Sequence, residues 1–527
     1  MKTKLTSSEL EVIRNNSGLQ RYLESLLKGK PATPRSWLYE QFSPEEVLGM
    51  WKQKLAVLEK GSEFEQNVFQ FDTSQEAKWG PQGGVEPISK LMDIVEDGYV
   101  RSPSTQAFRE SSWKLAKLRC RTTLKKLGVE SLRPATYQHV VDDMRARDTL
   151  ESNSGWPLFT RRNKPEVKKS SIRDAESGAW KTYPAIALFR NYNLKTRLVW
   201  MFPMSTNLVE GSYFQPLQSA IIARARVPLT FFAPWVGFEE VRDVISGVYN
   251  DPSSAIAASD FSSTDAHFRL AASLEVFDVI APCFQARFRD GLRESLEHMH
   301  SIPLIIGPDA KLVGEHGVSS GSNWTNFIET IFDWIFSEYV NIKLRRDGAP
   351  SGLCAIGDDM SWLSNRYDES FDKDLERLGK LVGQDIKAEK TTNFPNKVKF
   401  LQRLFQRGYN LQSGQTRAVY STIRALKSSV YPERFHDPRK WSSDMFCARQ
   451  FMILENCVDH PLFEEFVKFI CAGQKDLIPF SKKSTAVLER IRRETKLLPG
   501  LNPTYNQEKR DHSFADFASI KLASKLR

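Results

Sequence analysis

The feature that most constrains this chain is the tripeptide Gly357-Asp358-Asp359, which lies between two apolar segments. The flanking residues, 353–356 and 360–363, have the apolar character of two β-strands, so the tripeptide is predicted to form the turn between them. A strand–turn–strand unit holds adjacent carboxylates rigidly at a hairpin tip, where they can bind divalent cations. Gly and Asp are also ordinary turn residues, and on its own the tripeptide favours a plain surface hairpin.

A second pair of carboxylates lies upstream and changes that interpretation. Residues 255–259 form an apolar run that is predicted to be a buried strand, and Asp260 ends it. Asp265 follows five residues later. Asp265 is also typical of a helix start before the apolar stretch 268–279, and that position is compatible with a role in a site.

Between the two carboxylate segments lies a Ser/Gly-rich loop, residues 317–326, which runs into an apolar stretch from Phe327 to Leu344. A Ser-Gly loop before a helix is usually only a linker. Between two strands that carry carboxylates, it is predicted to bind a nucleotide. Its candidate residues are Ser320, Gly321, Thr325 and Asn326.

In chain order, Asp-x4-Asp, Ser-Gly-x3-Thr-Asn and Gly-Asp-Asp resemble motifs A, B and C of viral RNA-dependent RNA polymerases. Four further segments resemble other motifs of that family: 153–157 motif G, 195–200 motif F, 387–390 motif D and 400–405 motif E. All seven segments follow the family order. The chain length and the Ser-Gly-Ser-x-x-Thr-Asn form resemble the polymerases of small bisegmented double-stranded RNA viruses, with picobirnaviruses as the first choice and partitiviruses as the second.

One position departs from the family pattern. In many positive-strand viral enzymes an Asn lies four residues after the motif B Thr, whereas here Glu329 has that position and Asn326 directly follows Thr325. The resemblance therefore assigns ribose recognition to Asp265 first and to Asn326 second.

The resemblance implies an α/β (α+β) fold with the right-hand architecture of fingers, palm and thumb, whose palm is an antiparallel sheet flanked by helices. Residues 1–200 are expected to form the N-terminal part of the fingers with motifs G and F, 201–281 the palm with motif A, and 282–317 a fingers insertion. Residues 318–409 are expected to complete the palm with motifs B to E. Residues 410–527 are expected to form the thumb and a basic C-terminal tail.

The implied activity is RNA-directed RNA synthesis with two Mg²⁺ or Mn²⁺ ions, which stabilise the attacking and leaving oxygens. Asp260 and Asp358 are expected to be the main bridging ligands, with Asp359 secondary. Without cations, three close carboxylates would repel one another, which raises their proton affinity. Lys390 is implied as the general acid that protonates pyrophosphate, and Lys387 is the alternative. Either could instead be an ordinary surface lysine.

A basic segment precedes the first carboxylate strand. From Arg161 to Arg197 the chain has ten Lys/Arg and three Asp/Glu. Such a run is by default a solvated surface, but its position and its end at Lys195-Thr196-Arg197 predict a channel for the triphosphate. Arg197 is expected to contact phosphate directly, because a guanidinium binds phosphate through a two-pronged fork.

Asp265 decides the predicted substrate class. A DNA-making polymerase of this architecture has a bulky aromatic residue near this place, whereas a carboxylate is compact and can accept a hydrogen bond from the ribose 2′-hydroxyl. Ser320, Thr325 and Asn326 could complete this network. The alternative enzyme, a reverse transcriptase, would need the aromatic residue and usually a nuclease domain.

Motifs G and E imply template or primer contacts for Ser154, Gly155, Phe400, Leu401 and Arg403. A Pro-containing loop could offer a stacking surface for an initiating nucleotide, with core packing as the alternative; its aromatic residues are Tyr431, Phe435, His436 and Trp441. The tail, residues 481–527, has eleven Lys/Arg and five Asp/Glu. It could contact product RNA or the inner capsid wall, or be a solubilising surface.

A formal net charge of +10 and a pI near 9.1 favour a polyanionic partner. The predicted partners are template and product RNA and ribonucleoside triphosphates, with a viral capsid protein as a further candidate. A basic capsid protein that binds RNA would explain the charge, but not three carboxylates placed around a Ser-Gly loop.

Three observations bear on the compartment. No apolar run approaches the roughly 18 residues of a membrane span, so no membrane partner is expected. The first residues lack the apolar core of a secretory signal. The six scattered cysteines favour reduced thiols. We therefore expect the protein in the virion interior and the host cytoplasm.

Overall fold

Both carboxylate segments lie in one antiparallel sheet with the order β10-β4-β8-β7. The computed structural model describes the chain except residues 226–228, 346–347, 435–438, 440, 499–500 and 502–511. The strands of this sheet are β4 (Ala255–Ser262), β7 (Ser351–Ile356), β8 (Asp359–Ser364) and β10 (Thr392–Phe394), and β9 (Asp385–Ile386) pairs with the end of β4. Residues 255–259 are all buried, which agrees with the predicted buried strand.

Helices cover both faces of this sheet. The longest is α15 (Trp324–Leu344), which is apolar on more than one side because it is enclosed by protein on more than one side. It packs against β7, α6 (Ser111–Lys126) and α13 (Leu270–Ile280). Other helices around the sheet are α10 (Ala233–Val236), α11 (Phe238–Tyr249), α12 (Thr264–His267) and α16 (Phe371–Leu381). One large apolar core fixes the sheet and α15 relative to each other.

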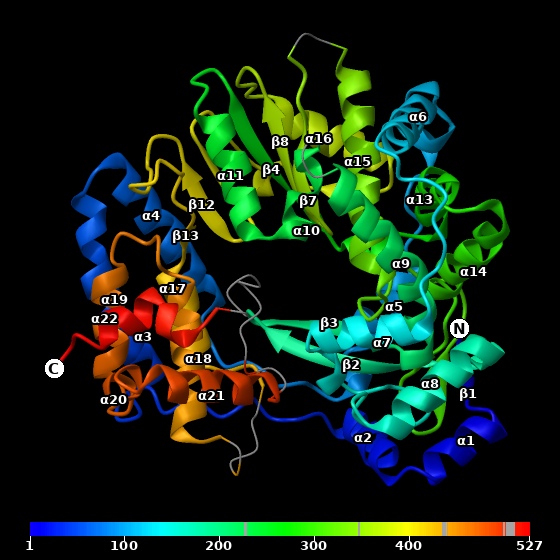
Figure 1. Cartoon of the computed structure of the whole chain (residues 1–527), viewed down its shortest axis with the longest axis horizontal. Helices are drawn as coiled ribbons and strands as arrows, with labels where there is room; N and C mark the ends of the chain where they lie inside the picture. Colours follow the sequence, from blue (N-terminus) through cyan, green and yellow to red (C-terminus); the bar gives the residue numbers. More distant parts are fainter. Residues whose placement is uncertain (226–228, 346–347, 435–438, 440, 499–500, 502–511) are drawn as a thin grey trace.

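A second sheet, in the order β1-β6-β5-β2-β3, joins segments that are far apart in the sequence. Its strands are β1 (Lys2–Lys4), β2 (Ala185–Tyr192), β3 (Lys195–Met201), β5 (Leu304–Ile305) and β6 (Ala310–Leu312). The helices of this half are α1 (Ser7–Arg14), α2 (Ser17–Lys28), α5 (Met92–Val100), α7 (Tyr137–Ala146), α8 (Pro165–Ser177), α9 (Met204–Ala225) and α14 (Arg289–Met299). In Figure 1, the β2–β3 hairpin projects from this half toward the middle of the molecule.

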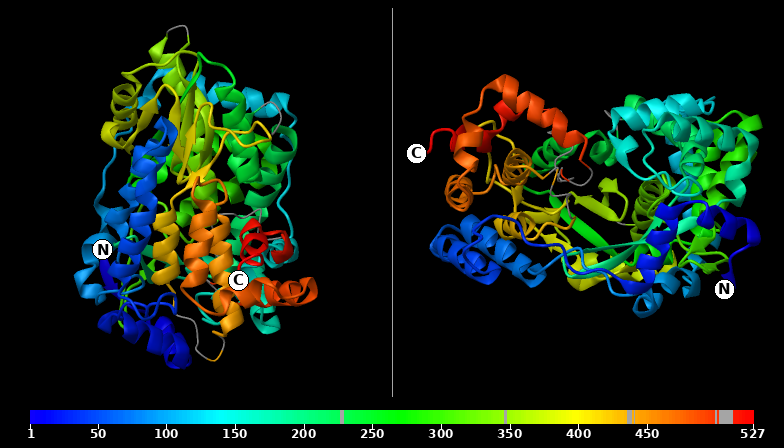
Figure 2. Two further views of the ribbon diagram at one scale, coloured as in Figure 1. Left: turned by 90° about the vertical axis from the view of Figure 1, so that its left-hand side faces the viewer. Right: turned by 90° about the horizontal axis from the view of Figure 1, so that it is seen from below.

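The C-terminal helices form a separate lobe with its own core. They are α17 (Thr422–Val430), α18 (Ser443–Glu455), α19 (Phe463–Ala472), α20 (Leu477–Ser481), α21 (Thr485–Lys496) and α22 (Ala518–Ala523). A small sheet of β11 (Lys397–Phe400), β12 (Arg403–Gln406) and β13 (Val419–Tyr420) leads into them. Two N-terminal helices, α3 (Pro44–Leu55) and α4 (Glu63–Thr73), share this core and lie beside α17 (Figure 2).

A buried carboxylate fastens α4 to the start of α17. Asp72 accepts hydrogen bonds from Ser421 Oγ at 2.6 Å, Ile423 N at 2.9 Å and His460 Nε2 at 2.8 Å. Burial opposes ionisation, but these hydrogen bonds outweigh it and lower the pKa of Asp72. The charged side chain therefore supplies the acceptor that the first N–H groups of α17 need.

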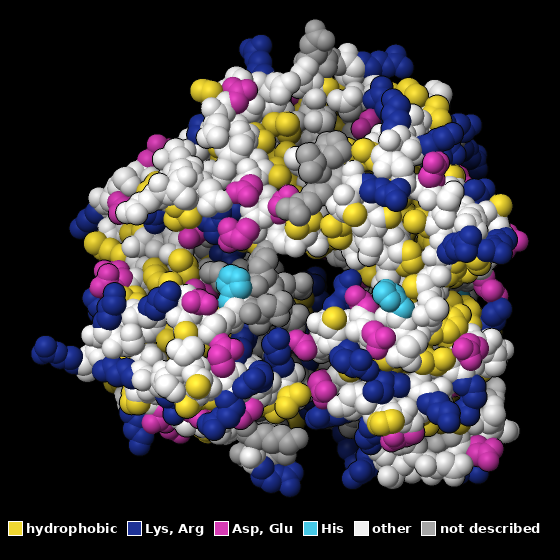
Figure 3. All heavy atoms as spheres, viewed as in Figure 1, with side chains coloured by type: hydrophobic (Ala, Val, Ile, Leu, Met, Phe, Trp, Pro, Cys, Tyr) yellow, Lys and Arg dark blue, Asp and Glu magenta, His cyan; other side chains and the backbone are white. Residues whose placement is uncertain are grey.

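The lobes surround a central hollow, which Figure 3 shows in the space-filling view. The aromatic residues of the Pro-containing loop are only partly described. Phe435 and His436 lie outside the described residues, Tyr431 is buried with its ring 5.7 Å from that of Trp79, and Trp441 packs on Trp37. For Tyr431 and Trp441 these contacts favour core packing. Among the described helices, none combines the length and apolar character needed to cross a bilayer.

Candidate active site

The β7–β8 hairpin and β4 bring the predicted catalytic carboxylates together. Asp260 at the end of β4 is the cross-strand partner of Asp359 at the start of β8. Asp358 is in the two-residue turn between β7 and β8, and its side chain is exposed. Gly357 begins that turn with a φ of +59°, a left-handed conformation that favours glycine. The strand register alone therefore places all three carboxylates at one end of the sheet.

The hairpin tip is held against α15. The backbone N–H of Gly357 donates to Thr330 Oγ1 at 2.9 Å. A Cβ added at Gly357 would lie 3.1 Å from Asn326 Nδ2 and 3.4 Å from Glu329 Oε2. This close approach fixes the position of Asp358 relative to the helix that follows the Ser-Gly loop.

The electrostatics of the tip are those of a crowded carboxylate cluster. Partial desolvation and the charges of Asp358 and Asp260 raise the pKa of Asp359 to about 7. Asp358 keeps contact with solvent, yet protein atoms surround most of its carboxyl group, and this crowding together with Asp260 raises its pKa. The Arg197 guanidinium acts in the opposite direction on both groups. Cations bound here would relieve the repulsion.

The donor chemistry suits a hard divalent cation, since Mg²⁺ and Mn²⁺ prefer carboxylate oxygens. Among the described residues, however, no three His, Cys, Asp or Glu side chains converge into a preformed metal cluster. The carboxylates are brought to one place by their strands, but their side chains are not gathered around a single point. Metal binding by Asp260, Asp358 and Asp359 stays a prediction.

The predicted phosphate-binding strand is β3. Lys195 and Arg197 are exposed on it, and the Arg197 guanidinium lies 4.9 Å from the ring centroid of Tyr192. The positive charge of Arg197 acts to lower the pKa values of Asp265, Asp358 and Asp359. The structure thus brings the predicted cation and the predicted carboxylates into one electrostatic environment.

Sequence reasoning missed further cations around this site. Lys78, in the N-terminal third, has its pKa lowered by burial and by Arg424 on α17, while Asp260 opposes the shift. Burial, Arg424 and Lys78 lower the pKa of Lys427 to about 7. Lys78 and α17 belong to segments without a motif, so only their packing reveals them.

The Ser-Gly loop is fixed against β3 and α12. Ser320 Oγ donates to Leu198 O at 3.3 Å, and a Cβ at Gly321 would overlap the carbonyl of Trp200. Thr325 is buried and donates to Ser319 O at 2.6 Å. Thr325 therefore holds the loop together, and its hydroxyl is turned away from solvent. The Asn326 side chain is exposed, and its Oδ1 accepts from Trp235 Nε1 at 3.4 Å.

A buried carboxylate on α9 anchors the same loop and was also missed. Glu210 accepts hydrogen bonds from Ser322 Oγ, from Asn323 N at 3.1 Å and from Asn207 Nδ2 at 3.0 Å. Burial raises the pKa of Glu210 to about 7, although these donors and Arg162 oppose the shift. No local pattern marks Glu210 as functional, because the loop residues that it binds, Ser322 and Asn323, lie more than a hundred residues away along the chain.

The segment predicted to border the template is folded onto the start of α9. Ser154 is buried, its N–H donates to Thr160 O at 2.7 Å, and its carbonyl accepts from Met204 N at 2.8 Å. Gly155 has a φ of +66°, and a Cβ there would lie 2.5 Å from Phe202 O. These two residues shape the backbone of this segment.

The motif E-like hairpin is β11–β12, and two of its three predicted contact residues are buried. Arg403 is buried, and its guanidinium donates to Ala418 O at 3.1 Å and Asn456 O at 2.9 Å. It also lies 4.5 Å from the ring centroid of Phe238. Phe400 is buried as well, so of the three predicted contact residues here only Leu401, in the turn, is partly exposed. The side chains of Arg403 and Phe400 pack inside the protein, and the RNA contacts expected of this hairpin stay a prediction.

The two candidate proton donors differ in their surroundings. Lys387 forms an ion pair with Asp385 at 3.0 Å, and this hydrogen bond raises the pKa of Lys387. Lys390 is exposed at the end of a short 3₁₀ turn, Ala388–Lys390. The ion pair stabilises the protonated form of Lys387, so Lys387 is a poor proton donor, which favours Lys390 as the predicted general acid.

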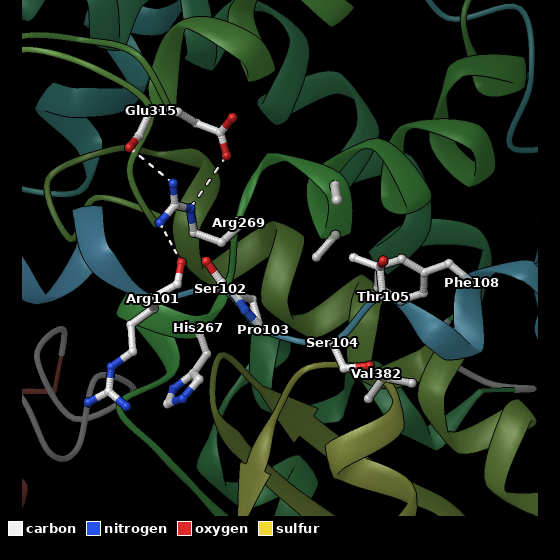
Figure 4. A pocket seen from close by; sticks show the side chains of 12 residues that line it. Arg101, Ser102, Pro103, Ser104, Thr105, Phe108, His267, Arg269, Glu315 and Val382 are labelled. Atoms are coloured by element: carbon white, nitrogen blue, oxygen red, sulfur yellow. Dashed lines mark hydrogen bonds and ion pairs between the residues drawn. The ribbon is translucent and has the colours of Figure 1, made fainter.

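A cavity of about 200 Å³ lies beside α12 (Figure 4). Its walls include Arg101, His267 and Arg269, but none of the predicted catalytic carboxylates. Arg269 is engaged there by Glu315 and by the carbonyls of residues 98 and 101. This cavity is therefore distinct from the carboxylate site.

Comparisons with known proteins support the resemblance to polymerases. Residues 193–426 match the family of viral RNA-dependent RNA polymerases. The chain is 26% identical over 481 residues to a potential RNA-dependent RNA polymerase of a human picobirnavirus, covering 87% of this chain and 86% of the relative. It is 25% identical over 206 residues to an RNA-directed RNA polymerase of Cryptosporidium parvum virus 1, covering 37% and 38%.

The structure is similar to the crystal structure of the RNA-dependent RNA polymerase of a human picobirnavirus, with a TM-score of 0.81 and 22% identity over 99% of both chains. An insertion-loop deletion mutant of that enzyme gives a TM-score of 0.79. The predicted right-hand polymerase fold of mixed α/β type is confirmed. The predicted resemblance to picobirnavirus polymerases is confirmed as well.

Proposed function

We propose that this chain, a viral RNA-dependent RNA polymerase similar to those of picobirnaviruses, both replicates and transcribes a double-stranded RNA genome by two-metal-ion nucleotidyl transfer. The main support is the strand register that pairs Asp260 with Asp359 and places Asp358 at the adjoining hairpin tip. Residues 193–426, which match the polymerase family, include all three of these carboxylates.

In this proposal Asp260 and Asp358 hold two Mg²⁺ or Mn²⁺ ions, and Asp359 assists. When bound, the ions stabilise the attacking 3′-oxygen and the leaving pyrophosphate. Asp260 and Asp358 also set the spacing of the site, because Asp260 lies in β4, Asp358 lies in the turn between β7 and β8, and the core fixes these strands. Burial, followed by the charges of neighbouring carboxylates, raises the pKa values of Asp358 and Asp359, and a bound cation would offset both effects.

Residues outside the sheet would position the substrate. Lys195 and Arg197 on β3 would bind the triphosphate, and Asp265 would accept a hydrogen bond from the ribose 2′-hydroxyl. Lys390 would donate the proton that pyrophosphate takes up as it leaves, a step that typically contributes about 10²–10⁴-fold to the rate. Ser320, Gly321 and Asn326 would line the sugar side of the site.

The domain division follows from the same proposal. The sheet of β1, β6, β5, β2 and β3 suits the fingers, because it joins strands from the two predicted fingers segments, residues 1–200 and 282–317. The β4–β10 sheet suits the palm, and α17–α22 suit the thumb. Residues 38–71 pack in the thumb core, so in this proposal they link the fingers segment to the thumb.

The proposed partners are template and product RNA, ribonucleoside triphosphates and, inside the particle, a viral capsid protein. We place the enzyme in the virion interior and the host cytoplasm. All six cysteines are buried free thiols, which suits a reducing compartment.

The experiment is incorporation of labelled ribonucleotides by the purified protein on a short single-stranded RNA, with Mg²⁺ or Mn²⁺ and with a chelator as the control. We expect product that depends on both the template and the divalent ion. Template-dependent product that persists in excess chelator would contradict the metal mechanism. No template-dependent product with either ion would contradict the proposed activity.

A further inference from the structure

The solvent side of α6 is a strongly basic surface that the proposed chemistry does not use. The helix has six Lys/Arg and no Asp or Glu. With the residues that follow it, the segment 111–133 has seven Lys/Arg and a single acid, Glu130. In Figure 3, Lys and Arg side chains gather around the position of α6. Like charges on one helix repel one another, so this cluster needs an explanation.

The cations of α6 fall into two groups. Lys117, on the side that packs against α13 and α15, forms an ion pair with Asp278 of α13 at 2.8 Å. Arg119 forms an ion pair with Glu338 of α15 at 3.2 Å. The other four cations face solvent and take part in no ion pair with another described residue; they define the basic face of α6: Lys114, Arg121, Lys125 and Lys126.

Three of these side chains form a row along the helix. Lys114, Arg121 and Lys125 are spaced by seven and four residues, which are close to whole turns, so they lie on one side of α6. At 1.5 Å per residue, the row is about 16 Å long. A nucleic-acid duplex carries a phosphate every few ångströms along each strand, so a row of this length can contact several phosphates at once.

The composition of the basic face favours nucleic acid over a protein partner. Three of its four cations are Lys, which is depleted from protein–protein interfaces. The exposed apolar residues of α6 are Leu115 and Leu118, with 41% and 51% of their surfaces exposed. Two such side chains are too few for the apolar core of an interface that buries about 800 Å² on each partner.

The basic face also favours a duplex over a single strand. Sites for single-stranded RNA combine cations with exposed aromatic rings on which the bases stack. The one aromatic residue of α6 is Trp113, and it is fully buried. Cations alone bind the phosphate backbone, which a duplex presents on its outside whatever its sequence.

This surface is separate from the carboxylate site. The helix α15 packs against both β7 and α6. In Figure 1, α6 lies at the edge of the molecule, on the side away from the C-terminal lobe. A duplex bound to the basic face therefore lies outside the central hollow.

We propose that the basic face of α6 is a second RNA-binding surface, which holds the phosphate backbone of the double-stranded genome on the outside of the enzyme. The inference rests on the proposed polymerase function and goes beyond it. A genome segment held at this place stays at a high effective concentration near the polymerase between rounds of synthesis.

The test measures binding of an RNA duplex that is closed at both ends by hairpin loops and offers no free 3′ end. The charge variant replaces the whole basic face: Lys114→Gln, Arg121→Gln, Lys125→Gln and Lys126→Gln. The logarithm of duplex affinity falls with the logarithm of salt concentration, with a slope of about 0.9 per phosphate contact. We expect this slope to be smaller by about 3–4 in the charge variant, and its affinity at about 50 mM salt to be at least about tenfold weaker. Its synthesis on a short single-stranded template should equal that of the parent.

The matched control removes four exposed cations that are scattered over α1, α2, α3 and the turn after α3: Arg14→Gln, Lys28→Gln, Lys54→Gln and Lys60→Gln. It has the same net charge as the charge variant, so it separates the cluster from the overall charge. A second variant, Leu115→Gln with Leu118→Gln, changes the apolar part of the surface and keeps every cation. We expect the control and this second variant to bind the duplex as the parent does. All these positions are at the surface, so we expect each variant to fold.

Three results would overturn the inference. Equal affinity and equal salt slope in the parent and the charge variant would show that the duplex binds elsewhere. An equal loss in the scattered control would reduce the effect to net charge. An equal loss in the Leu115→Gln, Leu118→Gln variant would indicate an apolar docking surface for a protein.

The outcome is distinguishable from a failure of the proposed function. Duplex binding is measured without nucleotides and does not require synthesis. A parent protein that binds the closed duplex through α6 but makes no RNA would contradict the polymerase proposal and leave the second RNA-binding surface in place.

Discussion

Removing the Glu210 side chain should release the loop that carries Ser320 and Gly321. Glu210 is the shared acceptor for Ser322 Oγ, Asn323 N and Asn207 Nδ2, and all of these contacts are at least partly buried. The Glu210→Ala substitution leaves these donors without their acceptor and opens a small cavity. The loop then keeps only its contacts to β3, such as the Ser320 bond to Leu198 O at 3.3 Å.

The magnitude follows from the number of donors that lose their acceptor. Each unsatisfied buried donor costs about 1–3 kcal/mol, but donors of one network are not additive. We expect Glu210→Ala to lower the free energy of unfolding by about 3–5 kcal/mol, the range for removing one partner of a buried charged network. Glu210→Gln keeps one acceptor oxygen and should lose about 1–2 kcal/mol.

The pH dependence has a definite sign. The folded state raises the pKa of Glu210 to about 7 from an ordinary value of 4.5, so this group stabilises the fold most below about pH 4.5. Its contribution is lost as the pH rises through about 7. Glu210→Gln should therefore cost more stability at low pH than at pH 8.

The assay is amide hydrogen exchange over residues 319–324, combined with denaturant unfolding and the polymerase rate. Glu24→Ala, which removes an exposed carboxylate on α2, is the control and should change stability by less than about 0.5 kcal/mol. We expect faster exchange of the Asn323 amide and a lower rate in Glu210→Ala alone. Unchanged exchange in this loop would refute the idea that Glu210 anchors it.

Three further predictions test other parts of the structure. Gly321→Ala should lower the free energy of unfolding by about 1–3 kcal/mol and remove most of the activity, because the added Cβ overlaps the Trp200 carbonyl. The control Gly247→Ala, where nothing lies within 4 Å of the added Cβ, should stabilise α11 by up to about 1 kcal/mol. Equal effects of the two substitutions in thermal unfolding and synthesis assays would contradict this prediction. The pKa of Asp359 is raised to about 7, so its ionisation destabilises the metal-free fold as the pH rises from about 4 to 7. Asp359→Asn should accordingly gain thermal stability over the parent at about pH 8 and not at about pH 4, and a pH-independent difference would argue against it. Asp72→Ala should lower stability in denaturant unfolding by about 3–5 kcal/mol, and a loss below about 1 kcal/mol would show that the α4–α17 link is weak.

The carboxylate centre could be predicted from the sequence because its signals are local. An apolar run that ends in Asp260 and a Gly-Asp-Asp turn each report on a few consecutive residues, and motif order supplies their mutual position. The exact register, Asp260 opposite Asp359, needed the structure, since a shift of one residue changes which side chains share a face.

The remaining parts of the site depend on long-range packing. Glu210 lies 112 residues from Ser322, and Lys78 reaches the site from the N-terminal third, so no spacing reveals either. The resemblance to motif E implied an RNA contact for Arg403, yet its guanidinium is stacked on Phe238 and hydrogen bonded inside the protein. Glu329 was visible only as a departure from the motif, and its burial on α15 required the fold.

The measurement that tests the central claim most directly is RNA-templated ribonucleotide incorporation by the parent and by Asp358→Ala, with RNA binding measured in parallel. Asp358 lies in an exposed turn, so its loss should leave the fold and RNA binding intact. We expect template-dependent product from the parent alone, and equal RNA affinity for both proteins. Equal synthesis by the two proteins would remove Asp358 from the mechanism and contradict the proposed metal site.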